Sequence, residues 1–342
     1  MLTIVRNDGT PRFTILCEPK CAGGAMRTML RRFLGPVAVF AIATLAQGCK
    51  PPNYPTGTIE KHFYANGTWA VTVQAGSLCC DSSGNKFDLY YPTNLGAGGF
   101  KHPILTWGNG TNGKASDVDY FLKHMASWGF VIIATQDKNT GVGQTILDVA
   151  NFLIARNGDP ASIFHNKLDV TQIGAIGASQ GATGAINALI KSAGAIKTVL
   201  PIELPAQTWC SSPANCVDTS HLTAGSVFFV DGSLDPVSPP TQLAGVTGEQ
   251  SIAAYYSAVP GGVAKLKGTL IGPTHNDVSG QPDCQHAQQP CIIGVYGYLG
   301  YPTAWMMDRL QGNALAHAAF VSGTGEMFSQ TKNWQLVASN IP

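Results

Sequence analysis

A serine lies between two glycines at the junction of two predicted elements, and this arrangement limits the folds that the chain can adopt. Gly177, Ser179 and Gly181 form the pattern Gly-x-Ser-x-Gly. The apolar run 172–176 before it is typical of a buried strand, and the small-residue run 182–192 after it is typical of a helix. At such a strand–turn–helix corner the serine hydroxyl stands clear of the sheet. The pattern therefore predicts a nucleophilic serine, and the flanking elements disfavour the alternative of a plain Gly-Ser turn.

Short apolar runs alternate with helical patterns along the rest of the chain, which indicates one α/β domain with a mostly parallel sheet. Strands are expected at 69–73, 87–91, 103–107, 130–135, 172–176, 198–203, 226–230 and 266–271. Helices are expected at 118–128, 145–155, 182–192, 302–310 and 313–321. We thus expect a central eight-stranded sheet with helices on both faces, in a catalytic domain over residues 56–342.

A serine hydroxyl is a poor nucleophile until a histidine takes its proton, and that histidine needs an acid to hold it. When the chain order is serine, acid, histidine, the acid and the base follow later strands of the sheet. Asp235 lies in the loop beyond one predicted strand, and His275 comes just past the last one. They are the predicted acid and base, with Asp231 and His286 as the alternatives.

Two backbone N–H groups are needed to hold the negative charge that develops on the substrate oxygen. Gln180, the residue after the nucleophile, supplies one of them. The glycine-rich loop 108–113 follows a predicted strand and supplies the other, with Thr111 as the expected donor. The alternative for this loop is a simple turn.

Residues 1–48 are predicted to be an N-terminal extension plus an export signal. Arg31 and Arg32 precede the apolar run 33–46, which is too short for a typical membrane span. Translation from Met26 or Met29 would place this signal at the start of the chain.

Cys49 ends the sequence Leu-Ala-Gln-Gly-Cys, which resembles a bacterial lipoprotein signal with an acylated cysteine. The proline-rich segment 49–55 is typical of a tether. Lipid anchoring through Cys49 and free secretion both stay open. Either way, we expect a secreted, periplasmic or cell-surface protein whose one membrane contact is that anchor.

Six cysteines follow Cys49, namely Cys79, Cys80, Cys210, Cys216, Cys284 and Cys291. An even number suits disulfide pairing in an oxidising compartment. The short spacings predict the pairs 210–216 and 284–291, whereas the adjacent residues 79 and 80 either pair or stay reduced. A zinc site is disfavoured because the chain has no Cys-x-x-Cys pair with a matching partner.

The charge balance excludes some classes of partner. Lys and Arg number 21 against 20 for Asp and Glu, so nothing electrostatic points to nucleic acid. Hydrophobic residues make up 44% and charged residues 12%, which excludes a disordered chain. No metal or organic cofactor is implied, and we expect a monomer.

Several segments, in their shared order, resemble the polyesterase–lipase–cutinase family of bacterial α/β-hydrolases, namely 67–72, 89–93, 126–132, 302–306 and 319–320. The resemblance covers nearly everything from residue 65 onward. It implies the α/β-hydrolase fold and activity on cutin-like or synthetic polyesters. It also implies Ser179, Asp235 and His275 as the triad, with the amides of Thr111 and Gln180 as oxyanion donors.

Trp209 matches a tryptophan that lines the substrate cleft in that family, with ordinary packing beside Cys210 as the alternative.

The family usually has an aromatic residue where Thr111 stands, and methionine or histidine where Gln180 stands. Both differences make the cleft more polar. The two disulfide loops also look longer than usual, so the resemblance supports ester hydrolysis better than polyester hydrolysis.

The sequence therefore predicts a carboxylic-ester hydrolase that forms an acyl-serine intermediate on a small-molecule or polymeric ester. An amidase or peptidase would use the same triad and is the first alternative. A surface lipoprotein that binds a ligand without catalysis is the second, and the intact catalytic set argues against it.

Overall fold

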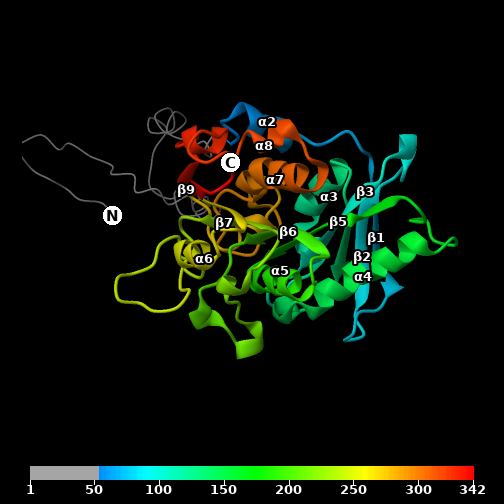
Figure 1. The fold of residues 1–342 in the computed structure, drawn as a ribbon, viewed down its shortest axis with the longest axis horizontal. Helices are drawn as coiled ribbons and strands as arrows, with labels where there is room; N and C mark the ends of the chain where they lie inside the picture. Colours follow the sequence, from blue (N-terminus) through cyan, green and yellow to red (C-terminus); the bar gives the residue numbers. More distant parts are fainter. Residues whose placement is uncertain (1–53) are drawn as a thin grey trace, which may run out of the picture. The chain divides into compact units, whose positions relative to one another are not determined.

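The computed structural model describes residues 54–342, and a nine-stranded sheet lies at their centre (Figure 1). The strands in chain order are β1 (Val71–Cys79), β2 (Lys86–Pro92), β3 (His102–Gly108), β4 (Val131–Thr135), β5 (Leu168–Ala178), β6 (Ile196–Ile202), β7 (Ser226–Gly232), β8 (Ala264–Leu270) and β9 (Trp334–Ser339). Their spatial order is β1-β2-β4-β3-β5-β6-β7-β8-β9. The pairs from β4 to β8 are parallel, and β1, β2 and β9 add antiparallel edges. This confirms the mostly parallel α/β fold.

Helices cover both faces of the sheet (Figure 1). One face carries α2 (Thr58–Tyr64), α3 (Asp119–Ser127), α7 (Gly300–Gln311) and α8 (Ala314–His317). The other face carries α4 (Gln144–Gly158), α5 (Gln180–Lys191) and α6 (Ile252–Ala258). Each layer buries its own apolar cluster against the sheet.

The burial of each strand follows from its place in the sheet. β3, β4 and β7 are buried at every residue, as expected for strands covered on both faces, and their sequences are nearly continuous apolar runs. The edge strand β1 instead alternates between half-buried and exposed residues, and its exposed positions include Val73, Ala75 and Ser77.

The prediction of eight strands is wrong by one, because β9 pairs antiparallel with the outer edge of β8. Its short sequence is mostly half-buried or exposed and carries no clear alternation.

The expected helix 313–321 is also shorter, since α8 ends at His317. The chain turns back there so closely that a Cβ on Gly325 would lie 2.4 Å from the carbonyl oxygen of Ala319.

All six cysteines of the described part are paired. Cys210–Cys216 and Cys284–Cys291 confirm the two predicted disulfides. Cys79 pairs with its neighbour Cys80, which was one of the two outcomes left open.

The predicted export signal and Cys49 lie outside the described residues, and the division of the chain at residues 48 and 55 stays a prediction. Tyr54, within the predicted tether, donates a hydrogen bond from its hydroxyl to the carbonyl of Ile271 at 2.8 Å. Among residues 54–342, no helix has the length and apolar character needed to span a membrane.

The corner between β5 and α5 depends on glycines. A Cβ on Gly177 would lie 2.1 Å from the carbonyl oxygen of Gly181, and a Cβ on Gly181 would lie 2.0 Å from that of Gly108. Backbone atoms cannot yield as a flexible side chain does, so helix, strand and the loop after β3 approach each other only without side chains.

We therefore expect Gly181→Ala to destabilise the fold by about 1–3 kcal/mol or more, the usual cost of overpacking. Gly158→Ala is the matched control, because Gly158 ends α4 and a Cβ there meets nothing within 4 Å. It should leave stability unchanged or raise it by up to about 1 kcal/mol. Thermal unfolding of the two variants checks this, and equal midpoints would contradict it.

Candidate active site

Ser179 stands between the end of β5 and the start of α5, in the backbone conformation expected of a nucleophile elbow. Its φ of 55° and ψ of −126° are rare for a residue with a Cβ. The backbone holds it there, because its N–H donates to the carbonyl of Ile202 at 3.0 Å and its carbonyl accepts from Ala182 at 2.8 Å. The serine hydroxyl is thereby lifted off the sheet.

A chain of two hydrogen bonds links Ser179 to His275 and Asp235. Ser179 Oγ lies 2.8 Å from His275 Nε2, and His275 Nδ1 lies 2.7 Å from Asp235 Oδ2. A carboxylate only accepts, so Nδ1 carries the proton and Nε2 is left to accept from the serine hydroxyl. The structure thus brings together the three residues that the sequence singled out.

Asp235 is held on both oxygens. Its Oδ1 accepts backbone N–H groups of Val237 at 2.8 Å and Ser238 at 3.1 Å, while its Oδ2 faces His275. The side chain is fully buried, so water does not compete for these bonds. A carboxylate tied in this way has one orientation.

The alternative acid and base lie elsewhere. Asp231 is fully buried within β7, where it accepts a hydrogen bond from the hydroxyl of Thr269 at 2.7 Å. Burial raises the pKa of the Asp231 carboxyl well above its ordinary value, which favours the neutral form. His286 is exposed in the loop between the paired cysteines.

The loops that carry Asp235 and His275 are hydrogen-bonded to each other. Leu234 donates its N–H to the carbonyl of Pro273 at 3.0 Å, and Ser233 donates its N–H to that of Leu270 at 2.8 Å. In return, Gly272 donates its N–H to the hydroxyl of Ser233 at 2.9 Å. Acid and base therefore keep their spacing through the backbone as well as through their own contact.

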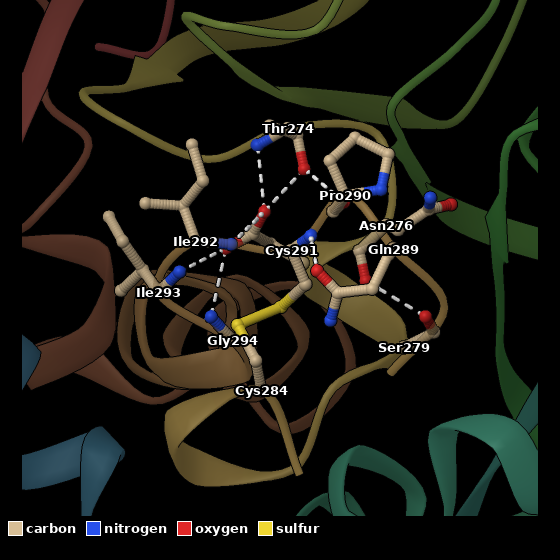
Figure 2. Close-up of a disulfide and its surroundings, with 11 residues drawn as sticks. Thr274, Asn276, Ser279, Cys284, Gln289, Pro290, Cys291, Ile292, Ile293 and Gly294 are labelled. Atoms are coloured by element: carbon tan, nitrogen blue, oxygen red, sulfur yellow. Dashed lines mark hydrogen bonds between the residues drawn. A yellow bond between two sulfur atoms is a disulfide. The ribbon is translucent and has the colours of Figure 1, made fainter. Parts of the chain in front are cut away.

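Asp277, which the sequence did not single out, anchors the histidine loop from the other side. Its Oδ1 accepts the N–H groups of Ile293 at 2.6 Å and Gly294 at 2.8 Å. Its Oδ2 accepts from the N–H of Thr274 at 2.8 Å and from the hydroxyl of Thr274 at 2.6 Å. Figure 2 shows Thr274, Ile293 and Gly294 gathered beside the Cys284–Cys291 disulfide. No motif marks Asp277, because its partners come from two separate segments.

Ser179 and His275 line a cavity of about 570 Å³. This size lies within the usual range for small-molecule sites. Its wall mixes apolar side chains such as Trp107 and Val118 with polar ones such as Gln288. A ligand bound in this cavity would therefore contact both apolar and polar side chains.

The other predicted site residues also lie on this cavity. Gln180 is the first residue of α5, so its N–H has no partner within the helix. Thr111 is exposed in the loop after β3, and that loop touches the nucleophile, since a Cβ on Gly110 would lie 3.5 Å from Ser179 Cβ. Trp209 is 60% exposed on the same wall, so it is not a core residue packed beside Cys210.

Two groups in the described part combine side chains of the types that bind metals. One joins Asp277 to Cys284 and Cys291, whose sulfurs are bonded to each other and therefore offer no thiolate. The other is Glu203, Asp235 and His275, in which His275 Nδ1 is already engaged by Asp235.

The parallel sheet, the helices on both faces and the serine at the β5–α5 corner define an α/β-hydrolase. The model of the PET hydrolase-like family matches residues 53–241, more than half of the chain, so the protein belongs to that family. This confirms the resemblance noted in the sequence, and it makes the chain a member of a family of carboxylic-ester hydrolases. The match includes Ser179 and Asp235 and ends before His275. No curated protein matches the chain.

Asp277→Ala should destabilise the protein by roughly 3 kcal/mol or more, because it leaves several buried N–H groups unpaired at about 1–3 kcal/mol each. Asp169→Ala is the control, since Asp169 accepts only exposed bonds from Thr171. It should change stability by less than about 0.5 kcal/mol. Denaturant unfolding separates the two variants, and a similar loss in both would show that Asp277 does not anchor the loop.

Proposed function

We propose that the protein hydrolyses carboxylic esters through an acyl-serine intermediate. The observation that carries this proposal is the unbroken chain Ser179–His275–Asp235 on the wall of the cavity, with contacts of 2.8 and 2.7 Å. Membership of the PET hydrolase-like family supports the ester as the bond that is cleaved.

In the acylation step, Ser179 Oγ attacks the ester carbonyl carbon while its proton passes to His275 Nε2. Asp235 holds the Nδ1–H and stabilises the imidazolium that forms. The N–H groups of Thr111 and Gln180 receive the oxyanion. Collapse of the tetrahedral intermediate expels the alcohol, which takes the proton from Nε2.

In the deacylation step, water attacks the acyl-serine carbonyl and gives its proton to His275 Nε2. The acid leaves, and that proton returns to Ser179 Oγ. Neither step needs a metal or an organic cofactor.

The substrate we propose is a small-molecule or polymeric ester with a polar as well as an apolar part. Trp209, exposed on the wall, can stack on an acyl or aromatic group. The exposed side chains of Thr111 and Gln288 line the same cavity and offer hydrogen-bonding groups to a polar part of the substrate. These features favour short or functionalised esters over long alkyl chains.

We also propose that the protein works outside the cytoplasm as a monomer, either secreted or anchored through Cys49. Three disulfides within residues 54–342 support an oxidising compartment. The anchor and the signal remain sequence-based proposals.

Ser179→Ala should abolish labelling by a fluorophosphonate probe and lower kcat for a p-nitrophenyl ester by about 10⁶-fold. Ser211→Ala is the control, because Ser211 lines the same cavity and its hydroxyl accepts a hydrogen bond from Asn215. It should keep full labelling. A labelled Ser179→Ala protein would rule out Ser179 as the nucleophile.

Asp235→Asn should lower kcat by roughly 10³–10⁴-fold, because an amide in place of the carboxylate favours the wrong imidazole tautomer. Asp231→Asn should retain most of the activity, since Asn resembles the neutral carboxyl that burial favours at that position. Steady-state kinetics on both variants decides between the two acids, and the reverse order would make Asp231 the acid.

A further inference from the structure

A second carboxyl lies against the histidine and has no part in the mechanism above. Glu203 directly follows β6, and its side chain is fully buried. Its Oε1 accepts a hydrogen bond from the hydroxyl of Tyr298 at 2.5 Å. Its Oε2 has no hydrogen-bond partner among the described residues. A buried carboxyl oxygen without a partner is costly, so its position calls for a reason.

The unpartnered oxygen faces His275. Glu203 Oε2 lies 4.0 Å from His275 Nδ1, the atom that Asp235 Oδ2 contacts at 2.7 Å. One carboxylate oxygen of Glu203, one of Asp235 and one ring nitrogen of His275 all lie within 4.8 Å of one another. Two carboxyls from different strands therefore approach the same edge of the imidazole ring.

The sheet explains this arrangement. β5, β6, β7 and β8 are successive parallel neighbours, so the residues just beyond their carboxyl ends share one edge. Ser179, Glu203, Asp235 and His275 occupy that edge, one after each strand. Glu203 takes the place between the nucleophile and the acid.

The backbone holds Glu203 in this place. Its φ of 54° is left-handed, a conformation that residues with a Cβ seldom adopt. Its N–H donates to the carbonyl of Val230 at 2.7 Å, which ties it to β7. Strained residues of this kind persist where the surrounding structure fixes them, and they are concentrated at functional sites.

The surroundings set the charge of Glu203. Burial, and next the charge of Asp235, raise the pKa of the Glu203 carboxyl well above its ordinary value. The groups that face it are the His275 ring, the Tyr298 hydroxyl and the carboxyls of Asp235, Asp277 and Asp231. Beside an ionised Asp235, this raised pKa favours the neutral form of Glu203. Without Asp235, one of the causes of the raised pKa disappears.

We propose that Glu203 is a positioning residue that serves as a second acid for His275, able to accept the Nδ1–H when Asp235 does not. This rests on the proposed ester hydrolysis through Ser179. In taking over, Glu203 loses its own proton to solvent and accepts the Nδ1–H as a hydrogen bond, so no other reactant is needed. The orientation of the ring then does not depend on Asp235 alone.

A double-mutant cycle on ester hydrolysis tests the proposal. Asp235→Ala opens space at Nδ1 for Glu203. We expect its kcat to be at least about tenfold higher than the kcat of the double variant Asp235→Ala with Glu203→Gln, in which no acid faces Nδ1. Loss of every acid lowers kcat by about 10⁴-fold. The effect of Glu203→Gln should thus be about tenfold larger without Asp235 than with it. Asp231→Asn in the Asp235→Ala background is the control and should leave the residual kcat unchanged. Equal effects in both backgrounds would overturn the proposal.

The pH profile gives a readout that a purely structural role would not change. The residual kcat of Asp235→Ala should rise with pH as Glu203 ionises. This rising limb of the pH profile should lie at higher pH than the rising limb of the wild-type profile. This limb should vanish in the double variant. A limb that survives Glu203→Gln would assign it to another group.

A measurement without turnover separates this proposal from the proposed function. The downfield proton resonance of His275 Nδ1–H reports its hydrogen bond to a carboxylate. We expect it to persist in Asp235→Ala at alkaline pH and to disappear in the double variant. Its loss already in Asp235→Ala would exclude Glu203 as a second acid even in an active enzyme. Its persistence in a protein without esterase activity would instead show that the proposed function fails while the second acid stands.

Discussion

The 2.7 Å hydrogen bond from His275 Nδ1 to Asp235 Oδ2 joins the loops that follow two neighbouring parallel strands. Backbone hydrogen bonds between these loops hold the same spacing, so the contact does not depend on two side chains alone. Because Asp235 is buried and engaged on both oxygens, the imidazole ring has one orientation, in which Nε2 faces Ser179. The convergence of residues 96 positions apart follows from the order of the strands.

The parts of this arrangement that could be predicted are those encoded locally. Glycines on both sides of Ser179, between an apolar run and a small-residue helix, are enough to predict the corner between β5 and α5. Asp235 could be predicted because it comes shortly after β7, whose apolar run is easily recognised, and His275 because it comes shortly after β8, which the sequence also predicts as a strand. Buried central strands leave such runs because both of their faces are covered.

The parts that could not be predicted depend on partners far away in the chain. Glu203 looks like the end of a strand until the fold brings Tyr298 to it across 95 positions. Asp277 gathers N–H groups from residues 15 to 17 positions further on, and no side-chain pattern records a backbone donor. The strand β9 likewise forms because β8 offers a free edge, and its own sequence shows little alternation.

The disulfides follow from the same division between sheet and loops. The sheet and its helices are stabilised by two buried apolar clusters, whereas residues around Trp209 and around Gln288 form only short 3-10 turns. Both segments line the cavity, so disorder in either of them would change the positions of residues that form the cavity wall. Cys210–Cys216 and Cys284–Cys291 each close a short loop there. Cross-links of this kind restrict the unfolded chain, so they stabilise the folded loops where burial contributes little and the cleft can keep polar walls.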